Sequence, residues 1–166
     1  MSDFMETGLL NGKKVLVVDD EPDVLETLED ILIMCDVVTA DSFEAANSLM
    51  EQDSFDIAVL DIMGVDGYRL LEKALDKKII AVMLTAGALS LKDTVKSYKK
   101  GAAGYIPKDK MADMPLYLTD ILEAKECGNH FWWRWKERFG SYYDRKFGTG
   151  WQEEDREFWD KSVYWY

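Results

Sequence analysis

Short apolar runs rich in β-branched residues recur along the chain, and most of them stop at a polar residue. Uninterrupted apolar runs of this length are typical of strands that are buried on both faces, as in a parallel sheet. They predict five strands, over Lys14–Val18, Asp36–Ala40, Ile57–Leu60, Lys78–Leu84 and, with the weakest pattern, Ala102–Ile106.

Between the runs, apolar residues follow the spacing of amphipathic helices. Helices are expected from Asp23 through Leu32, from a cap at Asp41 or Ser42 to about Glu51, from Tyr68, from Ser90 to Lys99, and over Leu116–Lys125. In the third of them, the residues expected to face inward are Leu70, Leu71, Ala74 and Leu75. A strand followed by a helix, repeated along the chain, predicts an α/β fold: a doubly wound parallel sheet with helices on both faces.

Residues with phosphate or metal chemistry follow four of the predicted strands. Asp19 and Asp20 follow the first, Asp61 the third, Thr85 the fourth and Lys108 the fifth. Considered alone, Asp61 is best explained as a strand cap that faces water. In a parallel sheet, however, all of these strand ends meet at one edge. Crowded carboxylates favour a cation, and oxygen ligands favour Mg²⁺, while lysine and threonine suit phosphoryl oxygens.

Composition narrows the function further. The formal charge of −12 would repel a phosphate backbone, which argues against nucleic-acid binding. The N-terminus shows no secretory signal, and no apolar stretch is long enough to span a bilayer. Cys35 and Cys127 are far apart in sequence, which favours reduced, structural thiols over a disulfide or a metal site. We therefore expect a soluble cytoplasmic protein.

Four pieces of sequence, each at a strand end and in a consistent order, carry a resemblance to a known family. They are VLVVDDEPDVLETL at 15–28, Asp61 with Asp66-Gly67 after it, LTAG at 84–87 and GAAGYIPK at 101–108. Over about residues 13–125, the chain resembles the CheY-like receiver domain of bacterial two-component response regulators. The resemblance implies a flavodoxin-like sheet with strand order 2-1-3-4-5.

The resemblance also implies a role for each strand-end residue. Asp61 would be the nucleophile that takes a phosphoryl group from a sensor histidine kinase or a phosphotransfer protein. Asp20, Asp61 and the backbone carbonyl of Met63 would ligate Mg²⁺ directly, with Asp19 acting through water. Lys108 would offset charge on the phosphoryl oxygens. Such a protein is not an enzyme in the usual sense, since it catalyses at most its own phosphorylation and dephosphorylation.

Two further residues match the switch of the family. Thr85 would donate a hydrogen bond to the phosphoryl group once Asp61 is modified. Tyr105 matches the aromatic position that turns inward as Thr85 moves, which changes the surface offered to partners. An ordinary strand aromatic is the alternative interpretation of Tyr105. Glu21 is interpreted as an exposed first-turn carboxylate that favours a helix N-terminus, with membership of the acidic cluster as the alternative.

The sequence departs from the family pattern beside the acceptor. The loop after Asp61 is about two residues shorter than usual and lacks the usual proline. Pro107 precedes Lys108, whereas the family has proline after the lysine; a cis Lys108–Asp109 bond would be costly, so this loop is expected to be built differently. One rival interpretation is a pseudo-receiver that binds partners without phosphorylation. Another is an aspartyl phosphohydrolase, against which Met63 argues, because such enzymes commonly carry a second acid there.

The C-terminal part is set apart by its aromatic residues. All six tryptophans lie after residue 131, so we divide the chain into an N-terminal tail (1–12), a receiver domain (13–127) and a helical aromatic-rich extension (128–166). Phe131, Trp135, Phe139 and Tyr142 share one predicted helical side, and Thr149 opens a second helix. These helices could pack on the receiver or on each other, or bind a downstream partner or a second subunit. Membrane-surface binding is a minor alternative, because the chain is acidic.

Overall fold

A five-stranded parallel sheet forms the centre of the computed structural model, which describes residues 8–86 and 91–126. The sheet order is β2-β1-β3-β4-β5. The strands are β1 (Lys14–Val18), β2 (Asp36–Ala40), β3 (Ile57–Asp61), β4 (Ile80–Thr85) and β5 (Gly104–Pro107). The predicted α/β class, the parallel sheet and the order implied by the resemblance are all confirmed.

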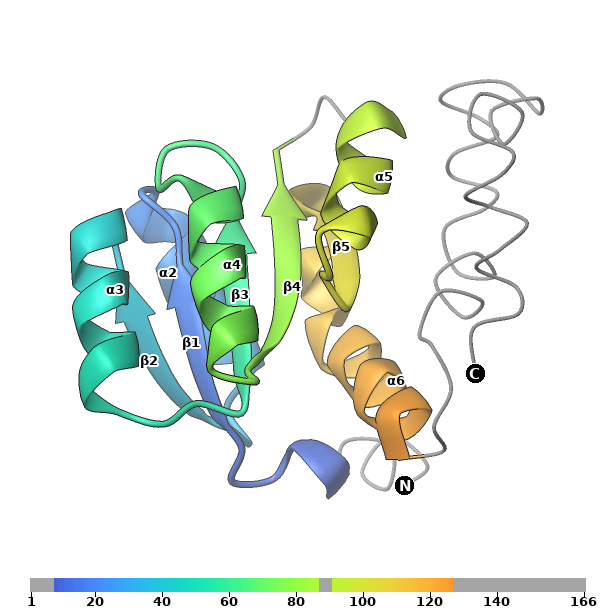
Figure 1. The fold of residues 1–166 in the computed structure, drawn as a ribbon. Coiled ribbons are helices and arrows are strands. Elements are labelled where there is room, and N and C mark those ends of the chain that lie inside the picture. Colours follow the sequence, from blue (N-terminus) through green and yellow to red (C-terminus); the bar gives the residue numbers. More distant parts are fainter. Residues whose placement is uncertain (1–7, 87–90, 127–166) are drawn as a thin grey trace. The chain divides into compact units, whose positions relative to one another are not determined.

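Helices connect the strands and cover the sheet. They are α2 (Pro22–Ile31), α3 (Phe43–Gln52), α4 (Gly67–Asp76), α5 (Leu91–Lys99) and α6 (Met114–Glu126), with short 3₁₀ turns η1 (Gly8–Leu10) and η2 (Lys108–Asp113). Figure 1 shows α3 and α4 in front of the sheet and α2 behind it. The chain divides into two compact units, residues 1–119 and 120–166, so the sheet lies wholly within the first.

The core lies where the sequence pattern places it. The apolar residues of β1 and β3 are buried throughout, because both strands are covered on two faces. Leu70, Leu71 and Ala74 on α4 are fully buried, as predicted. Leu75 does not follow that prediction, since it is 37% exposed. It lies on the flank of α4, where its side chain packs over Gly101, close to the site of the missing Cβ.

Local capping settles one of the open alternatives. Ser42 is the N-cap of α3, and its hydroxyl accepts a hydrogen bond from the backbone N–H of Ala45 at 3.1 Å. Asp41, the other candidate, precedes the cap. Among the described residues, the expected boundaries of the other helices and strands are met within a few residues, β4, β5 and α6 each beginning two positions from the expected residue.

The predicted N-terminal tail contributes to the interior. Leu10, at the end of η1, is fully buried, and its carbonyl accepts a weak hydrogen bond from the Cys35 thiol at 3.5 Å. Burial raises the pKa of that thiol to about 11, so it stays protonated and poorly nucleophilic at neutral pH. Cys35 therefore fits the structural role expected for it, whereas Cys127 lies outside the described residues.

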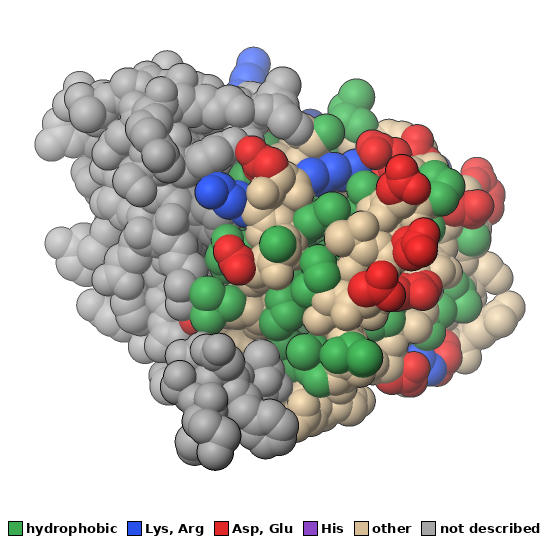
Figure 2. All heavy atoms as spheres, turned by 180° about the vertical axis from the view of Figure 1, so that it is seen from behind, with side chains coloured by type: hydrophobic (Ala, Val, Ile, Leu, Met, Phe, Trp, Pro, Cys, Tyr) green, Lys and Arg blue, Asp and Glu red, His purple; other side chains and the backbone are tan. Residues whose placement is uncertain are grey.

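The surface is strongly acidic. The face opposite to that of Figure 1 shows many more Asp and Glu side chains than Lys and Arg (Figure 2). Glu26, Glu29 and Asp30 on the outer side of α2 are among the exposed acids. In the part of the chain that is described, no helix combines the length and the apolar character that crossing a bilayer requires. The predicted aromatic helices after residue 128 lie outside the described residues.

Candidate functional site

The carboxyl edge of the sheet collects the charged ends of three strands. Asp19 directly follows β1, Asp61 ends β3, and Lys108 directly follows β5. β1 and β3 are parallel neighbours, with Val18 opposite Leu60. β4 pairs in parallel with both β3 and β5, so the carboxyl ends of these strands lie along one edge of the sheet. The side chains converge because every strand runs in the same direction.

Lys108 lies at the centre of this group of acids. Its Nζ is 2.9 Å from Asp19 Oδ2, 3.0 Å from Glu21 Oε1 and 3.5 Å from Asp61 Oδ1. Asp19 and Asp61 are buried, and the Lys108 side chain is only 12% exposed. The structure thus brings together three of the predicted site residues, Asp19, Asp61 and Lys108, and adds Glu21 as a direct partner of the lysine.

Burial and crowding make the carboxylates harder to ionise. Burial, assisted by the nearby charge of Asp19, raises the pKa of Asp61 from 3.8 to about 6. Burial also raises the pKa of Asp19, against the opposing hydrogen bonds from the Glu21 backbone and Lys108. For Lys108, burial alone would lower the pKa, but its hydrogen bonds to Asp19 and Glu21 outweigh burial and raise it. One ammonium does not neutralise the carboxylates around it.

The donor set suits a hard divalent cation. Asp19, Asp20 and Glu21 each offer a carboxylate oxygen, and these oxygens lie within 4.8 Å of one another. Asp19 Oδ2 is buried 2.9 Å from the Lys108 ammonium, and that single positive charge leaves the surrounding carboxylates with excess negative charge. All-oxygen ligation with exposed positions left for water is the arrangement that Mg²⁺ prefers. Asp61 is not in this close group, so its role as a metal ligand stays a prediction.

The short loop after β3 closes over the acidic residues. Gly64 has a φ of +81°, and a Cβ there would lie 2.5 Å from Asp20 Oδ2. Asp66 also has a positive φ, of 54°, directly before α4. A Cβ on Gly67 would collide with the backbone carbonyl oxygen of Asp61. Glycines at these two positions therefore let the backbone of the short loop lie directly against Asp20 and the end of β3.

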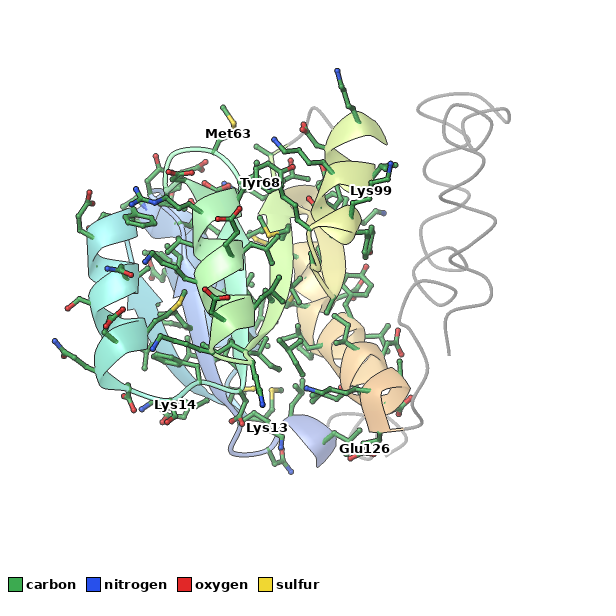
Figure 3. The ribbon with its side chains drawn as sticks, viewed as in Figure 1. Lys13, Lys14, Met63, Tyr68, Lys99 and Glu126 are labelled. Atoms are coloured by element: carbon green, nitrogen blue, oxygen red, sulfur yellow. The ribbon has the colours of Figure 1, made fainter. Side chains whose placement is uncertain are left out.

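Met63 lies at the outer end of that loop. Its side chain is 75% exposed and points away from the sheet (Figure 3). A functional contribution from this residue would therefore come from its backbone, as the resemblance implies. Its carbonyl as a metal ligand stays a prediction.

The segment around Lys108 is built without an unusual peptide bond. Pro107 ends β5 with extended backbone, and Lys108 opens η2. The peptide bonds of the described residues are all trans, in agreement with the expectation that Lys108–Asp109 would not adopt the costly cis form. The turn into η2 delivers the lysine to the site instead.

The predicted switch residues lie on neighbouring strands: Thr85 ends β4, and Tyr105 is the second residue of β5. Thr85 is largely buried, and its hydroxyl donates to the carbonyl of Ala86 at 3.3 Å. Tyr105 is completely buried, and burial raises its pKa to about 12, partly offset by hydrogen bonding with the hydroxyls of Thr85 and Thr94. Tyr105 therefore lies inward in this structure, and its movement with Thr85 stays a prediction.

Tyr68 makes a second connection at this edge, which sequence reasoning missed. It lies in the first turn of α4 (Figure 3). Its hydroxyl contacts the Asp93 carbonyl and the Ser97 hydroxyl of α5, each at 3.3 Å. Lys96 lies 4.3 Å from its ring centroid. The residue that follows the short loop thus fixes α5, the helix that comes after Thr85.

Comparisons with known proteins place this geometry in a family. The family model of the response regulator receiver domain matches residues 15–117. Heme response regulator HssR from Staphylococcus aureus is 35% identical over 97 residues, which cover 56% of this chain and 43% of that protein. The two-component response regulator ORR24 from rice (Oryza sativa subsp. japonica) is 28% identical over 124 residues, which cover 70% of this chain and 20% of that protein. The chain therefore spans less than half the length of these curated relatives.

Solved structures agree with the family model. A putative response regulator from Chloroflexus aurantiacus is 28% identical, with a TM-score of 0.60 over 68% of this chain and 99% of the other. A CheY-like receiver domain protein from Methanospirillum hungatei is 27% identical, with a TM-score of 0.57 over 69% of this chain and 99% of the other. The chain belongs to the response regulator receiver domain family.

Proposed function

We propose that this chain is a phosphorylatable receiver of a two-component phosphorelay. Asp61 accepts a phosphoryl group from a sensor histidine kinase or a phosphotransfer protein, and the modification changes which partner the receiver binds. The observation that carries the proposal is the environment of Asp61. It is a buried carboxylate at the end of a central strand, 3.5 Å from Lys108 and beside Asp19.

The chemistry follows from those contacts. An Asp61 carboxylate oxygen attacks the phosphorus of the donor phosphohistidine and forms an acyl phosphate. The phosphorus–nitrogen bond breaks, and the electron pair stays on the imidazole nitrogen, which takes up a proton. With a pKa of about 6, Asp61 is mostly ionised at neutral pH and can act as the nucleophile. Lys108, already 3.5 Å away, compensates charge on the phosphoryl oxygens.

Mg²⁺ is the cofactor that we propose for this site. Asp19 and Asp20 supply oxygens close enough to share an ion, and the excess of carboxylates over the single Lys108 ammonium supports that assignment. When bound, the ion would neutralise part of the carboxylate charge and part of the charge on the phosphoryl oxygens.

Modification of Asp61 changes the surroundings of Thr85. Its hydroxyl, now bonded to the Ala86 carbonyl, would turn to a phosphoryl oxygen, and the Tyr105 beside it would respond. Such a rearrangement shifts the population between two states of the surface near α5. A downstream protein reads that surface in our proposal, and the residues after 128 offer a second place for a partner or a second subunit.

In this role the protein turns over no external substrate. The chain catalyses at most its own phosphorylation and dephosphorylation, and it works in the cytoplasm with its kinase. Because it spans less than half the length of the curated relatives above, their output activities are not carried over to it.

Phosphorylation can be tested with a small phosphodonor. The full chain is incubated with Mg²⁺ and acetyl phosphate, and its intact mass is followed. We expect one phosphoryl adduct in the wild type and none in Asp61→Asn. Asp56→Asn is a matched control, because Asp56 lies at the other end of the same strand, where its carboxylate accepts from the Lys14 backbone N–H at 2.8 Å. It should form the adduct as the wild type does.

Other outcomes identify the rival functions. No adduct in the wild type, with or without Mg²⁺, would overturn the proposal in favour of a pseudo-receiver that binds partners without phosphorylation. Continuous release of phosphate over many turnovers would instead indicate a phosphohydrolase.

A further inference from the structure

Glu21 contacts Lys108 in a way that the phosphorylation chemistry does not require. The Lys108 ammonium donates a hydrogen bond to Glu21 Oε1 at 3.0 Å. Asp19 Oδ2 lies at a similar distance, 2.9 Å, from the same nitrogen. Asp61 Oδ1 is further away, at 3.5 Å. Lys108 therefore has three carboxylate neighbours, and Glu21 is the exposed one of the three.

The backbone holds Glu21 in position for this contact. Glu21 is the N-cap residue of α2, with extended backbone, and its N–H donates to Asp19 Oδ1 at 2.9 Å. Pro22 then fixes the start of the helix. Lys108 opens η2, so the ion pair joins the beginning of α2 to the turn after β5.

We propose that Glu21 is a positioning residue that holds Lys108 in the unmodified protein and competes for it with the phosphoryl group on Asp61. This inference rests on the proposed phosphorylation of Asp61. It gives Glu21 a regulatory effect on the site: the stronger its hold on the lysine, the less readily the modified state forms.

Exposure makes Glu21 the partner that Lys108 can leave most easily. The Glu21 side chain is 59% exposed, so water can replace the lysine when the pair opens. Asp19 is fully buried, and its ionised form would lose a compensating charge without recovering water. A phosphoryl group on Asp61 carries more negative charge than a carboxylate and would draw the ammonium from Glu21.

A second role for Glu21 makes the opposite prediction. Its carboxylate also lies close to those of Asp19 and Asp20 and could ligate the metal. As a metal ligand, Glu21 would help the modified state to form, and its removal would weaken that state. As a holder of Lys108, it opposes that state, and its removal strengthens it.

The experiment measures beryllofluoride, a stable mimic of the phosphoryl group, binding to the full chain in the presence of Mg²⁺. The dissociation constant is obtained from the ¹⁹F NMR signal of the bound probe for wild type and Glu21→Gln. Glu21→Gln should bind the probe about two- to five-fold more tightly, the range expected from losing one exposed ion pair. The affinity for Mg²⁺ alone, measured by calorimetry, should fall less than about three-fold, as it would after losing one screened charge.

Two further variants separate the contact from general electrostatics. Asp23→Asn removes the same charge from the first turn of the same helix, where the residue is exposed, and should leave the affinity for the probe nearly unchanged. In a Lys108→Met background, Glu21→Gln should give no gain, because the residue it competes for is absent. A double-mutant cycle thus isolates the pair.

Each contrary result overturns the inference. Equal affinity in Glu21→Gln and wild type, a gain that persists with Lys108→Met, or an equal gain in Asp23→Asn would each do so. A large loss of Mg²⁺ affinity in Glu21→Gln would instead identify a metal ligand. Failure of the proposed function is distinct from all of these, since the wild type would then neither bind the probe nor form the acetyl phosphate adduct.

Discussion

Charges are paired at the amino end of the sheet and unbalanced at its carboxyl end. At the amino end, Lys14 forms an ion pair with Asp53, and its backbone N–H donates to Asp56 at 2.8 Å. At the carboxyl end, one ammonium, that of Lys108, faces several carboxylates. Figure 3 shows Lys14 at the opposite end of the molecule from Met63, which marks the carboxyl end.

The pKa shifts record the difference. The hydrogen bond from Lys14 lowers the pKa of Asp53, so ionised Asp53 stabilises the fold. Burial raises the pKa of Asp61, so ionised Asp61 destabilises it. The amino end is arranged for stability, whereas the carboxyl end keeps a charge imbalance that a bound cation or an added partner would relieve. A binding site at that edge is maintained at the expense of stability.

The largest expected effect is a gain of stability when the imbalance is reduced. The rise in the pKa of Asp61 from 3.8 to about 6 corresponds to at most about 3 kcal/mol. Asp61→Asn, measured by urea unfolding near neutral pH without divalent ions, should therefore be more stable than wild type by up to that amount. Asp56→Asn, at the amino end of the sheet, should not be more stable than wild type. A less stable Asp61→Asn would contradict the comparison.

Close packing of the short loop supplies the next prediction. Gly64→Ala and Gly12→Ala both place a side chain on backbone of positive φ, but only at Gly64 would the Cβ meet Asp20. Both variants should lose about 1 kcal/mol of stability. Only Gly64→Ala should also weaken Mg²⁺ binding, by about ten-fold, measured by calorimetry, because it displaces a ligand. Equal metal affinities in the two variants would show that the loop does not position Asp20.

The pH dependence has opposite signs at the two ends. The pKa of Asp61 is raised in the folded state, so folding is favoured while this carboxyl is protonated. The stabilisation is fully present below the unfolded pKa and is lost as pH rises through about 6. Metal-free protein should lose about 1 kcal/mol between roughly pH 5 and pH 7, a loss that is absent from Asp61→Asn. The pKa of Asp53 is lowered in the folded state, so its ionised carboxylate stabilises the fold above the unfolded pKa. Acidification removes that stabilisation. Urea unfolding of wild type and Asp61→Asn across this pH range provides the check. If the stability of the two proteins changed equally with pH, the assignment to Asp61 would be refuted.

The smallest effect belongs to the amino end. Lys14→Met removes the ion pair with Asp53, but both side chains are partly exposed, so solvent already screens the interaction. The loss of stability should be smaller than the changes above and should shrink further in high salt. Urea unfolding at two ionic strengths measures it. A loss that is large and independent of salt would show that the amino end is as strained as the site.

Much of the fold could be predicted because pattern and topology agree. β1 and β2 have their expected bounds, since uninterrupted β-branched runs leave little choice of register. The weak fifth run was misplaced by two residues, because Ala102 and Ala103 favour a strand poorly and the observed β5 begins at Gly104. Leu75 was predicted to face inward but is partly exposed, because spacing along a helix does not reveal which of its flanks is covered by neighbouring elements.

The site was predictable only in part. Asp19, Asp61 and Lys108 could be brought together from sequence, because parallel strands place their carboxyl ends at one edge. The contact of Glu21 with Lys108 could not, since it depends on how the start of α2 meets η2. Gly64 was missed for the same kind of reason: its need for glycine arises from the approach of Asp20, a residue far away in sequence.

Buried Leu10 has a practical consequence for work with shortened proteins. The family match begins at residue 15, so a fragment trimmed to that limit would lack Leu10. Its removal would leave a void beside Cys35 and expose that thiol to oxidants and alkylating reagents. A fragment intended for crystallisation or NMR should therefore retain η1, beginning no later than Gly8.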